Sequence, residues 1–107
     1  MLTKLEEQVL MTVWRFKGDG YGVNIFQFLD GINEKRVTMG VVYDILERLR
    51  KNGYVRTRHG DPTPKRGGMR KRYYEITRTG IDELIRSRAV YDRVMADFDE
   101  LAKEHRS

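Results

Sequence analysis

The chain contains no cysteine, only two histidines and only two prolines among its 107 residues. Without cysteine there is no disulfide framework, no thiolate metal site and no cysteine nucleophile. No apolar run approaches the roughly 20 residues that a membrane helix needs, and no signal-peptide core follows a basic start. These absences predict a cytoplasmic protein with no cofactor, no metal site and no membrane contact.

The charged and polar residues show no catalytic arrangement. We find no paired carboxylates, no nucleophile with a base and no phosphate-cradling glycine motif at a useful spacing, so we expect no enzyme. At about 100–150 residues per domain, a chain of 107 residues forms one domain. Because a chain this short buries only about 60–70% of its unfolded surface, we expect an oligomer that hides more apolar area.

Positive charge is concentrated in one stretch of the chain. Residues 35–72 carry 12 basic and three acidic side chains, a net charge of +9, although the whole chain carries only +5. The other residues together carry a net charge of −4. Such a stretch creates a positive field that attracts polyanions, and each phosphate it neutralises releases counterions. The alternative is a charged surface that only faces solvent.

The first half of the chain has the pattern of three helices. Thr3 opens a capping box, with a glutamate three residues later, before a first helix. A second helix is predicted for residues 21–29, and Thr38 caps a third that Gly53 ends. Helical spacing predicts the buried residues of the second helix as Val23, Ile25, Phe26 and Leu29, and those of the third as Val41, Val42, Ile45, Leu46 and Leu49.

Two strand-like runs follow, residues 54–58 and 72–77, which mix β-branched and aromatic residues with basic ones. The segment between them, residues 60–69, holds both prolines and three of the ten glycines of the chain. It is longer than the usual hairpin loop of about two to five residues, so we expect a flexible tip. The two strands and this loop form a predicted hairpin, which we call the wing.

The last segment predicts one long helix over residues 78–104, capped by Thr77 or Thr79. Apolar residues recur in it every seven residues and form a seam along one side. A helix of about 25 residues spans about 40 Å, which is longer than this small core can cover. A second copy of the chain is the simplest cover for the seam, so we predict a homodimer. The predicted interface residues are Leu84, Tyr91, Val94, Phe98 and Leu101.

The order of these elements is typical of a winged helix-turn-helix. We therefore predict an α+β fold, mainly α, with a winged-helix DNA-binding domain at residues 1–78. Residues 79–107 are predicted as a long C-terminal dimerisation helix within the same compact unit. A helix-turn-helix places its second helix in the DNA major groove, and that helix here is the third of the chain.

The first turn of this third helix is predicted to face base edges. Thr38 offers a hydroxyl, Met39 an apolar contact and Gly40 a close backbone approach, although a plain helix cap explains Thr38 equally well. The basic wing suits a phosphate-lined groove, and a solvated loop is its alternative. The predicted DNA contacts are Lys35, Arg36, Thr38, Met39, Gly40 and Tyr43 in the helix-turn-helix, and Lys65, Arg66, Arg70, Lys71 and Arg72 in the wing.

Aromatic residues at helical spacing most often pack in a core or an interface. A sharper hypothesis is that Trp14, Tyr91 and Phe98 line a pocket between two subunits for a small aromatic effector. The two histidines, His59 and His105, have no further ligands at metal spacing, so we predict no metal site.

Several motifs together resemble one known family. They are Tyr21-Gly22 at the start of the second helix, residues 40–49, residues 52–55, and the arginine-rich, double-tyrosine run at residues 72–80. With them, the chain from about Leu5 to Leu84 is similar to the PadR family of transcriptional regulators, in its short form with a single C-terminal helix. The resemblance implies a homodimer on an inverted-repeat operator and a phosphate contact supported by Tyr21. Some members of that family sense phenolic acids or cationic drugs.

The residues and the resemblance thus predict a sequence-specific DNA-binding repressor that binds an inverted-repeat operator as a homodimer. The main alternative is a general, architectural nucleic-acid-binding protein that uses the wing without base readout or effector. A winged-helix protein-interaction module is a third hypothesis, against which the +9 charge of residues 35–72 argues.

Overall fold

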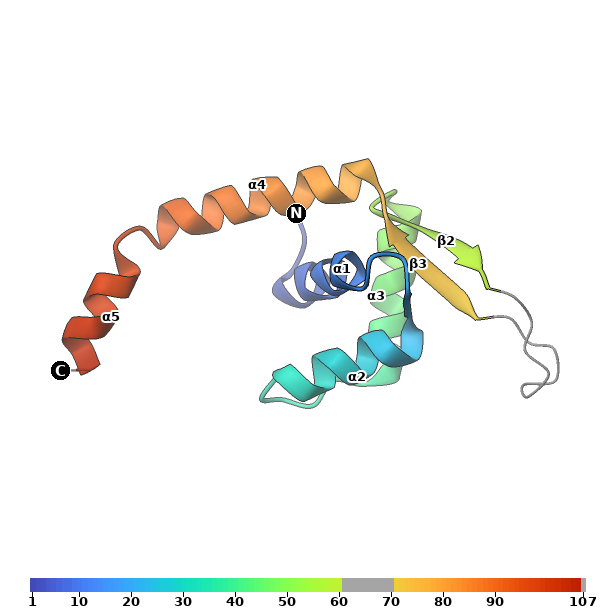
Figure 1. Ribbon diagram of the computed structural model, residues 1–107, viewed down its shortest axis with the longest axis horizontal. Helices are drawn as coiled ribbons and strands as arrows, with labels where there is room; N and C mark the ends of the chain where they lie inside the picture. The colour runs from blue at the N-terminus through green and yellow to red at the C-terminus, as the bar shows by residue number, and fades with distance from the viewer. Residues whose placement is uncertain (61–70, 107) are drawn as a thin grey trace.

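The computed structural model describes residues 1–60 and 71–106, and it has the predicted mainly helical α+β architecture (Figure 1). Three helices lie beside a small sheet, and a long helix crosses over the first of them and runs away from the rest. The elements are α1 (Lys4–Phe16), β1 (Gly20–Tyr21), α2 (Gly22–Ile32), α3 (Met39–Lys51), β2 (Val55–His59), β3 (Arg72–Ile76), α4 (Arg78–Val94) and α5 (Phe98–Arg106).

The predicted helix caps are confirmed. The Thr3 hydroxyl accepts from the Glu6 amide at 3.2 Å, and the Glu6 carboxylate accepts from the Thr3 amide at 2.8 Å. The Thr3 amide hydrogen bond, with the Arg48 guanidinium 3.6 Å away, holds the pKa of Glu6 below its ordinary value. The Thr38 hydroxyl accepts from the Val41 amide at 3.2 Å and begins α3. Polar side chains therefore satisfy amides that the first turn of a helix leaves unpaired.

The sheet has three antiparallel strands in the order β1-β3-β2. The sequence predicted β2 and β3 but not β1, which has only two residues and so offers no periodicity. β1 pairs Gly20 with Tyr74 and Tyr21 with Tyr73. Because neighbouring residues of a strand point to opposite faces, Tyr74 is buried in the core while Tyr73 lies on the other face.

The core is built from one apolar stripe on each of the first three helices, joined by Val55 and Tyr74 of the sheet. Two residues that the sequence predicted as buried are exposed instead, Val23 at 39% and Val41 at 41%. At about 100° per residue, a helix that turns Ile25 and Val42 inward turns these two valines outward. The fully or nearly fully buried helical residues are Val9, Leu10, Val13, Ile25, Leu29, Val42, Ile45, Leu46 and Leu49.

The start of α4 is locked to the turn between α3 and β2. The Thr77 hydroxyl donates to the Gly53 carbonyl at 2.6 Å and accepts from the Gly80 amide at 3.1 Å. Gly80 packs so closely that an added Cβ would lie 2.3 Å from the Tyr54 carbonyl oxygen and 2.7 Å from Cγ1 of Ile76. Glycine at this position therefore sets the direction in which α4 leaves the core.

The prediction of one helix over residues 78–104 is wrong, because the helix breaks between α4 and α5. Asp97 has a φ of 67°, a left-handed conformation that a short polar side chain tolerates. The seven-residue spacing continues through the break, so periodicity alone could not reveal it. Beyond the first turns of α4 no core of the same chain supports the segment, and we call residues 89–106 the arm.

The arm makes the molecule elongated. Its extents are 57 × 28 × 20 Å and its radius of gyration is 16.6 Å, whereas a compact chain of this length has about 13 Å. Figure 1 shows α4 leaving the core and α5 bending back toward the side on which α2 lies. The arm thus projects beyond the core of its own chain.

Gly80→Ala is expected to destabilise the fold by about 1–3 kcal/mol, because the new methyl group has to displace the Tyr54 backbone or Ile76. Gly31→Ala, in α2, is the matched control, since an added Cβ there meets nothing within 4 Å. The control is expected to raise stability by about 0.5–1 kcal/mol through helix propensity. Urea unfolding of both variants measures the difference, and equal effects would contradict the close packing of Gly80.

Candidate nucleic-acid interface

The first turn of α3 lies at the surface, where Thr38 and Gly40 are exposed. Thr38 is occupied as the helix cap, but its side chain is still exposed, so cap and ligand contact are compatible. An added Cβ at Gly40 would meet nothing within 4 Å. Met39 is half-buried beside it. This end of the helix carries a partial positive charge from its aligned peptide dipoles, which attracts anions.

Three of the predicted DNA contacts meet at the start of α2. The Tyr43 ring fills the place of a side chain at Gly22, where an added Cβ would lie 2.3 Å from the tyrosine Cζ. Gly22 directly follows Tyr21, and Nζ of Lys71 lies 4.2 Å from the centre of the Tyr21 ring. The Tyr21 amide donates to Oδ1 of Asn24 at 2.8 Å, which fixes the start of the helix. Residues from α3, α2 and the wing thus form one cluster.

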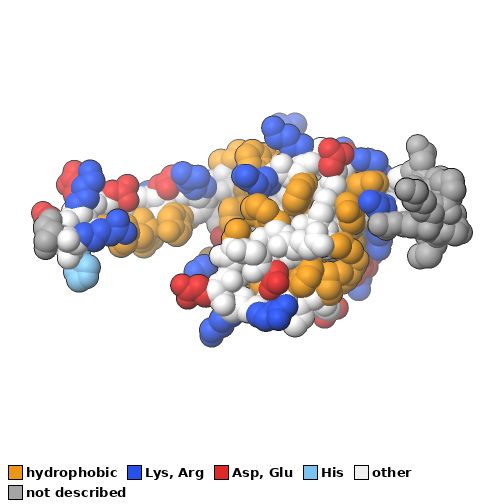
Figure 2. All heavy atoms as spheres, turned by 60° about the horizontal axis from the view of Figure 1, so that its bottom comes forward, with side chains coloured by type: hydrophobic (Ala, Val, Ile, Leu, Met, Phe, Trp, Pro, Cys, Tyr) orange, Lys and Arg blue, Asp and Glu red, His pale blue; other side chains and the backbone are white. Residues whose placement is uncertain are grey.

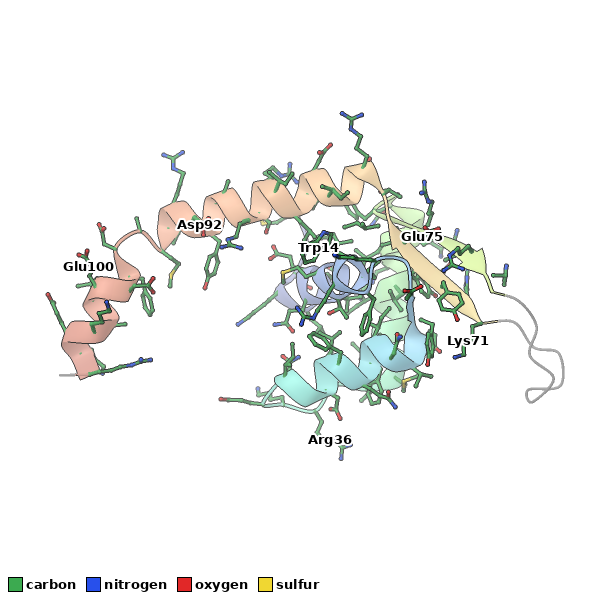
Figure 3. The ribbon with its side chains drawn as sticks, in the orientation of Figure 1. Trp14, Arg36, Lys71, Glu75, Asp92 and Glu100 are labelled. Atoms are coloured by element: carbon green, nitrogen blue, oxygen red, sulfur yellow. The ribbon has the colours of Figure 1, made fainter. Side chains whose placement is uncertain are left out.

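Lys35 and Arg36 lie in the connection between α2 and α3, at a distance along the chain from this cluster. Oδ1 of Asp30 accepts from the Val37 amide at 3.3 Å and so anchors the connection to α2. The Arg36 guanidinium lies 3.9 Å from the same carboxylate and is largely exposed (Figure 3). Together with the start of α1, this connection borders a groove of about 700 Å³. The two cations flank the first turn of α3.

Two of the five predicted wing contacts, Lys71 and Arg72, lie in the described part of the chain. The other predicted wing contacts, Lys65, Arg66 and Arg70, lie outside the described residues, as does the tip of the predicted loop. Figure 3 shows Lys71 just before the first residue of β3, on the side of the strand that faces the start of α2. The guanidinium carbon of Arg72 lies 5.8 Å from the centre of the Tyr74 ring.

Cations of this surface differ in whether a carboxylate already neutralises them. Within residues 1–60 and 71–106, Lys35, Lys71 and Arg72 form no ion pair. Arg50, by contrast, donates twice to Glu47, and this pair raises the pKa of Arg50 and lowers the pKa of Glu47. A cation without a carboxylate partner is available to a phosphate, because no existing pair has to be broken.

The loop end of the two wing strands holds two residues that the sequence did not single out, Arg58 of β2 and Tyr73 of β3. The Arg58 guanidinium carbon lies 4.5 Å from the centre of the Tyr73 ring, and its Nη2 donates to the Gly18 carbonyl at 3.0 Å. Alternation along each strand predicts only that Tyr73 and Tyr74, like Arg58 and Thr57, point to opposite faces of the sheet. Only the pairing register shows that they are neighbours.

The apolar seam of the predicted dimer interface is exposed on α4 and α5. Val94 is 77% exposed and Phe98 is 49% exposed, and Tyr91 and Leu101 are exposed as well. Figure 2 shows hydrophobic side chains gathered along one side of the arm. Leu84 behaves differently, because it packs against the core of its own chain.

Trp14 of α1 faces α4 across a shallow groove of about 430 Å³ (Figure 3). Its indole is 51% exposed. The other two residues of the predicted effector pocket, Tyr91 and Phe98, do not line this groove within one chain. The residues that line it with Trp14 are Ile81, Leu84, Ile85, Arg88, Ala89 and Asp92.

Two further findings concern the described residues only. Within them, no group of three or more histidine or acidic side chains is placed to hold a metal ion. None of the helices among them is both long and apolar enough to cross a membrane.

Several solved structures of transcriptional regulators have a fold similar to that of this chain. The structure resembles that of a PadR-like transcriptional regulator from Bacillus cereus, with a TM-score of 0.73, 21% identity and coverage of 92% of this chain and 90% of that one. It also resembles a PadR family transcription regulator from Clostridium difficile, with a TM-score of 0.66, 23% identity and coverage of 86% and 96%.

A transcriptional regulator from Clostridium thermocellum has a TM-score of 0.67 and 20% identity, with coverage of 89% of each chain. At these identities the likeness establishes the winged helix-turn-helix fold. No protein with curated annotation matches the chain. A sequence profile of the transcriptional regulator PadR-like family matches residues 2–86, which is most of the chain. The protein therefore belongs to the PadR-like family of transcriptional regulators.

Proposed function

We propose that the chain represses transcription as a homodimer that binds an inverted-repeat operator. The observation that carries the proposal is the first turn of α3, which is exposed, has open space at Gly40 and closely follows two exposed cations, Lys35 and Arg36. A regulator of this family binds DNA, and this turn is the part of a helix-turn-helix that enters the major groove.

Within this proposal the residues divide into two roles. Met39 and Thr38 read base edges, and Gly40 lets the backbone approach the groove closely. Tyr21 and Tyr43 support phosphate contacts, which position the protein without reading sequence. The cations that bind phosphates are Lys35, Arg36, Lys65, Arg66, Arg70, Lys71 and Arg72.

The exposed apolar residues of the arm support the proposed homodimer. Its exposed apolar side chains lie on a segment that the core of the same chain does not cover, and a second copy offers an identical seam. A two-fold dimer presents two α3 helices related by the same symmetry, so its operator is an inverted repeat.

Selection of bound fragments from random DNA tests the proposal directly. A two-fold-symmetric motif that is bound at least a hundred times more tightly than random DNA at fixed salt is expected. Binding that shows no such preference would instead favour the architectural alternative, which uses only the phosphate contacts. No binding to duplex DNA even at low salt would overturn both.

Gly40→Ala is expected to leave the fold intact or stabilise it slightly, because nothing lies within 4 Å of the new methyl group. It is expected to weaken binding to the selected operator about tenfold or more, because the methyl group separates the helix from the base edges. Gly31→Ala adds the same group to α2 and is expected to leave affinity unchanged. Fluorescence anisotropy measures both, and equal affinities would remove the first turn of α3 from the interface.

Val94→Asp combined with Phe98→Asp is expected to yield monomers, because two charges enter the exposed apolar seam of the arm. Sedimentation velocity reports the oligomeric state, and operator affinity is expected to fall at least tenfold with the loss of the second half-site contact. Arg106→Asp, at the end of α5, is a charge control outside the seam. A double variant that sediments as a dimer would show that the interface lies elsewhere.

The groove beside Trp14 supports a second, regulatory role for the same dimer. We place the aromatic effector site here, with Tyr91 and Phe98 of the dimer completing it. The chain has a single tryptophan, so its fluorescence reports on this site alone. A planar aromatic such as 2-naphthoate is expected to quench it in the wild-type dimer and not in Tyr91→Ala with Phe98→Ala. Equal quenching in both would remove these two residues from the site.

A further inference from the structure

Three side chains form a row across the sheet near the loop end of the wing strands. Tyr21 of β1 is the direct partner of Tyr73 of β3, and Arg58 of β2 is the direct partner of the same tyrosine. Directly opposite residues in antiparallel strands point to the same face and contact each other. The row therefore joins all three strands on the face opposite to buried Tyr74.

The contacts along this row are continuous. The Arg58 guanidinium carbon lies 4.5 Å from the centre of the Tyr73 ring. The rings of Tyr73 and Tyr21 have centres 5.8 Å apart and an angle of 83° between their planes, which is an edge-to-face contact. The Lys71 ammonium continues the row at 4.2 Å from the Tyr21 ring centre. Cations lie at both ends, where the negative faces of the rings stabilise them.

The surroundings hold the Tyr73 ring in place. An added Cβ at Gly60 would lie 2.6 Å from Cε2 of Tyr73, so the glycine makes room for the ring. The Gly60 amide donates to the Lys71 carbonyl at 2.8 Å and closes the described part of the wing. Arg58 is fixed from the other side, because it donates to the Gly18 carbonyl at 3.0 Å and lies 3.8 Å from Asp19.

The segment that contains Tyr21 also contacts α3. Tyr21 belongs to β1 and its neighbour Gly22 begins α2, and the Tyr43 ring of α3 packs directly on Gly22. Tyr73 contacts this short segment from the wing, and Tyr43 contacts it from α3. The orientation of the wing relative to α3 is therefore fixed through two adjacent residues rather than through the core alone.

We propose that Tyr73 is a positioning residue for DNA binding. Its ring, held between Arg58 and Tyr21, keeps the wing at a fixed angle to α3, so that both engage one duplex at the same time. The proposal rests on the proposed DNA-binding function and adds that the two DNA-contacting parts act as one rigid body. Its physical basis is preorganisation, since a wing that is already oriented loses less conformational freedom on binding.

Two substitutions of Tyr73 separate positioning from direct contact. Tyr73→Leu removes the ring and is expected to weaken operator binding about three- to tenfold. Tyr73→Phe keeps the ring and loses only the hydroxyl, so it is expected to bind like the wild type. If Tyr73→Phe is as weak as Tyr73→Leu, the hydroxyl contacts DNA and the positioning role is wrong. If Tyr73→Leu binds like the wild type, the role is also wrong.

Arg58 allows a second comparison that does not depend on how Tyr73→Leu folds. Arg58→Gln removes one positive charge together with everything that Arg58 holds in place: the contact to the Tyr73 ring, the hydrogen bond to Gly18 and the ion pairs on its other side. Arg56→Gln, two residues earlier on β2, removes one positive charge but no ring contact; Arg56 only lies 3.9 Å from Glu75. Arg58→Gln is expected to weaken operator binding at least threefold more than Arg56→Gln. Equal losses would mean that only net charge matters and would overturn the proposal.

A spectroscopic measurement tests the positioning role without DNA. The chain has no cysteine, so spin labels on Gln27→Cys in α2 and His59→Cys in β2 report one distance between wing and helix-turn-helix. Tyr73→Leu is expected to broaden this distance distribution, and Tyr73→Phe is expected to leave it unchanged. An unchanged width in Tyr73→Leu overturns the positioning role. A wild type that ignores duplex DNA overturns the proposed function but leaves this measurement decisive for the wing.

Discussion

Burial of one narrow apolar stripe from each of α1, α2 and α3 is the constraint on which the structure depends. Each stripe provides two to four buried aliphatic side chains, and together they form an apolar interior that excludes water. Everything else follows from what that core leaves outside. The first turn of α3, the cations at the loop end of the wing strands and the arm all lie outside this core.

Local chemistry predicted most of the fold. Thr3, Thr38 and Thr77 each place a hydroxyl where a helix has to begin, and Gly53, with a φ of 81°, follows the end of α3. Such signals act within one turn of chain and need no tertiary information. Val23 and Val41 were wrongly assigned to the core, since apolarity identifies a stripe but not its edges. The break at Asp97 escaped because apolar spacing continues across it.

The candidate site was predictable where its residues lie next to a local signal in the sequence, but not where they meet across the fold. Residues next to a recognisable turn, such as Thr38 and Gly40, could be named from the sequence, and membership of a regulator family agrees with the expectation that the chain is not an enzyme. The partnership of Tyr21 with Tyr73 could not be predicted, because it depends on the register of strands that lie far apart in the chain. Likewise, only the folded chain shows that Tyr43 rests on Gly22.

The arm with its bend at Asp97 allows two properties of the proposed dimer to change independently. These properties are the base sequence that it recognises and the spacing between its two half-sites. In the proposed dimer, the residues that read bases lie in the first turn of α3, whereas α4 and α5 set the distance between the two α3 helices. Each residue inserted before the bend moves the distal segment by about 1.5 Å and rotates it by about 100°. Insertions or deletions in the arm can therefore change the half-site separation that the proposed dimer binds, while the base sequence that α3 recognises in each half-site stays the same.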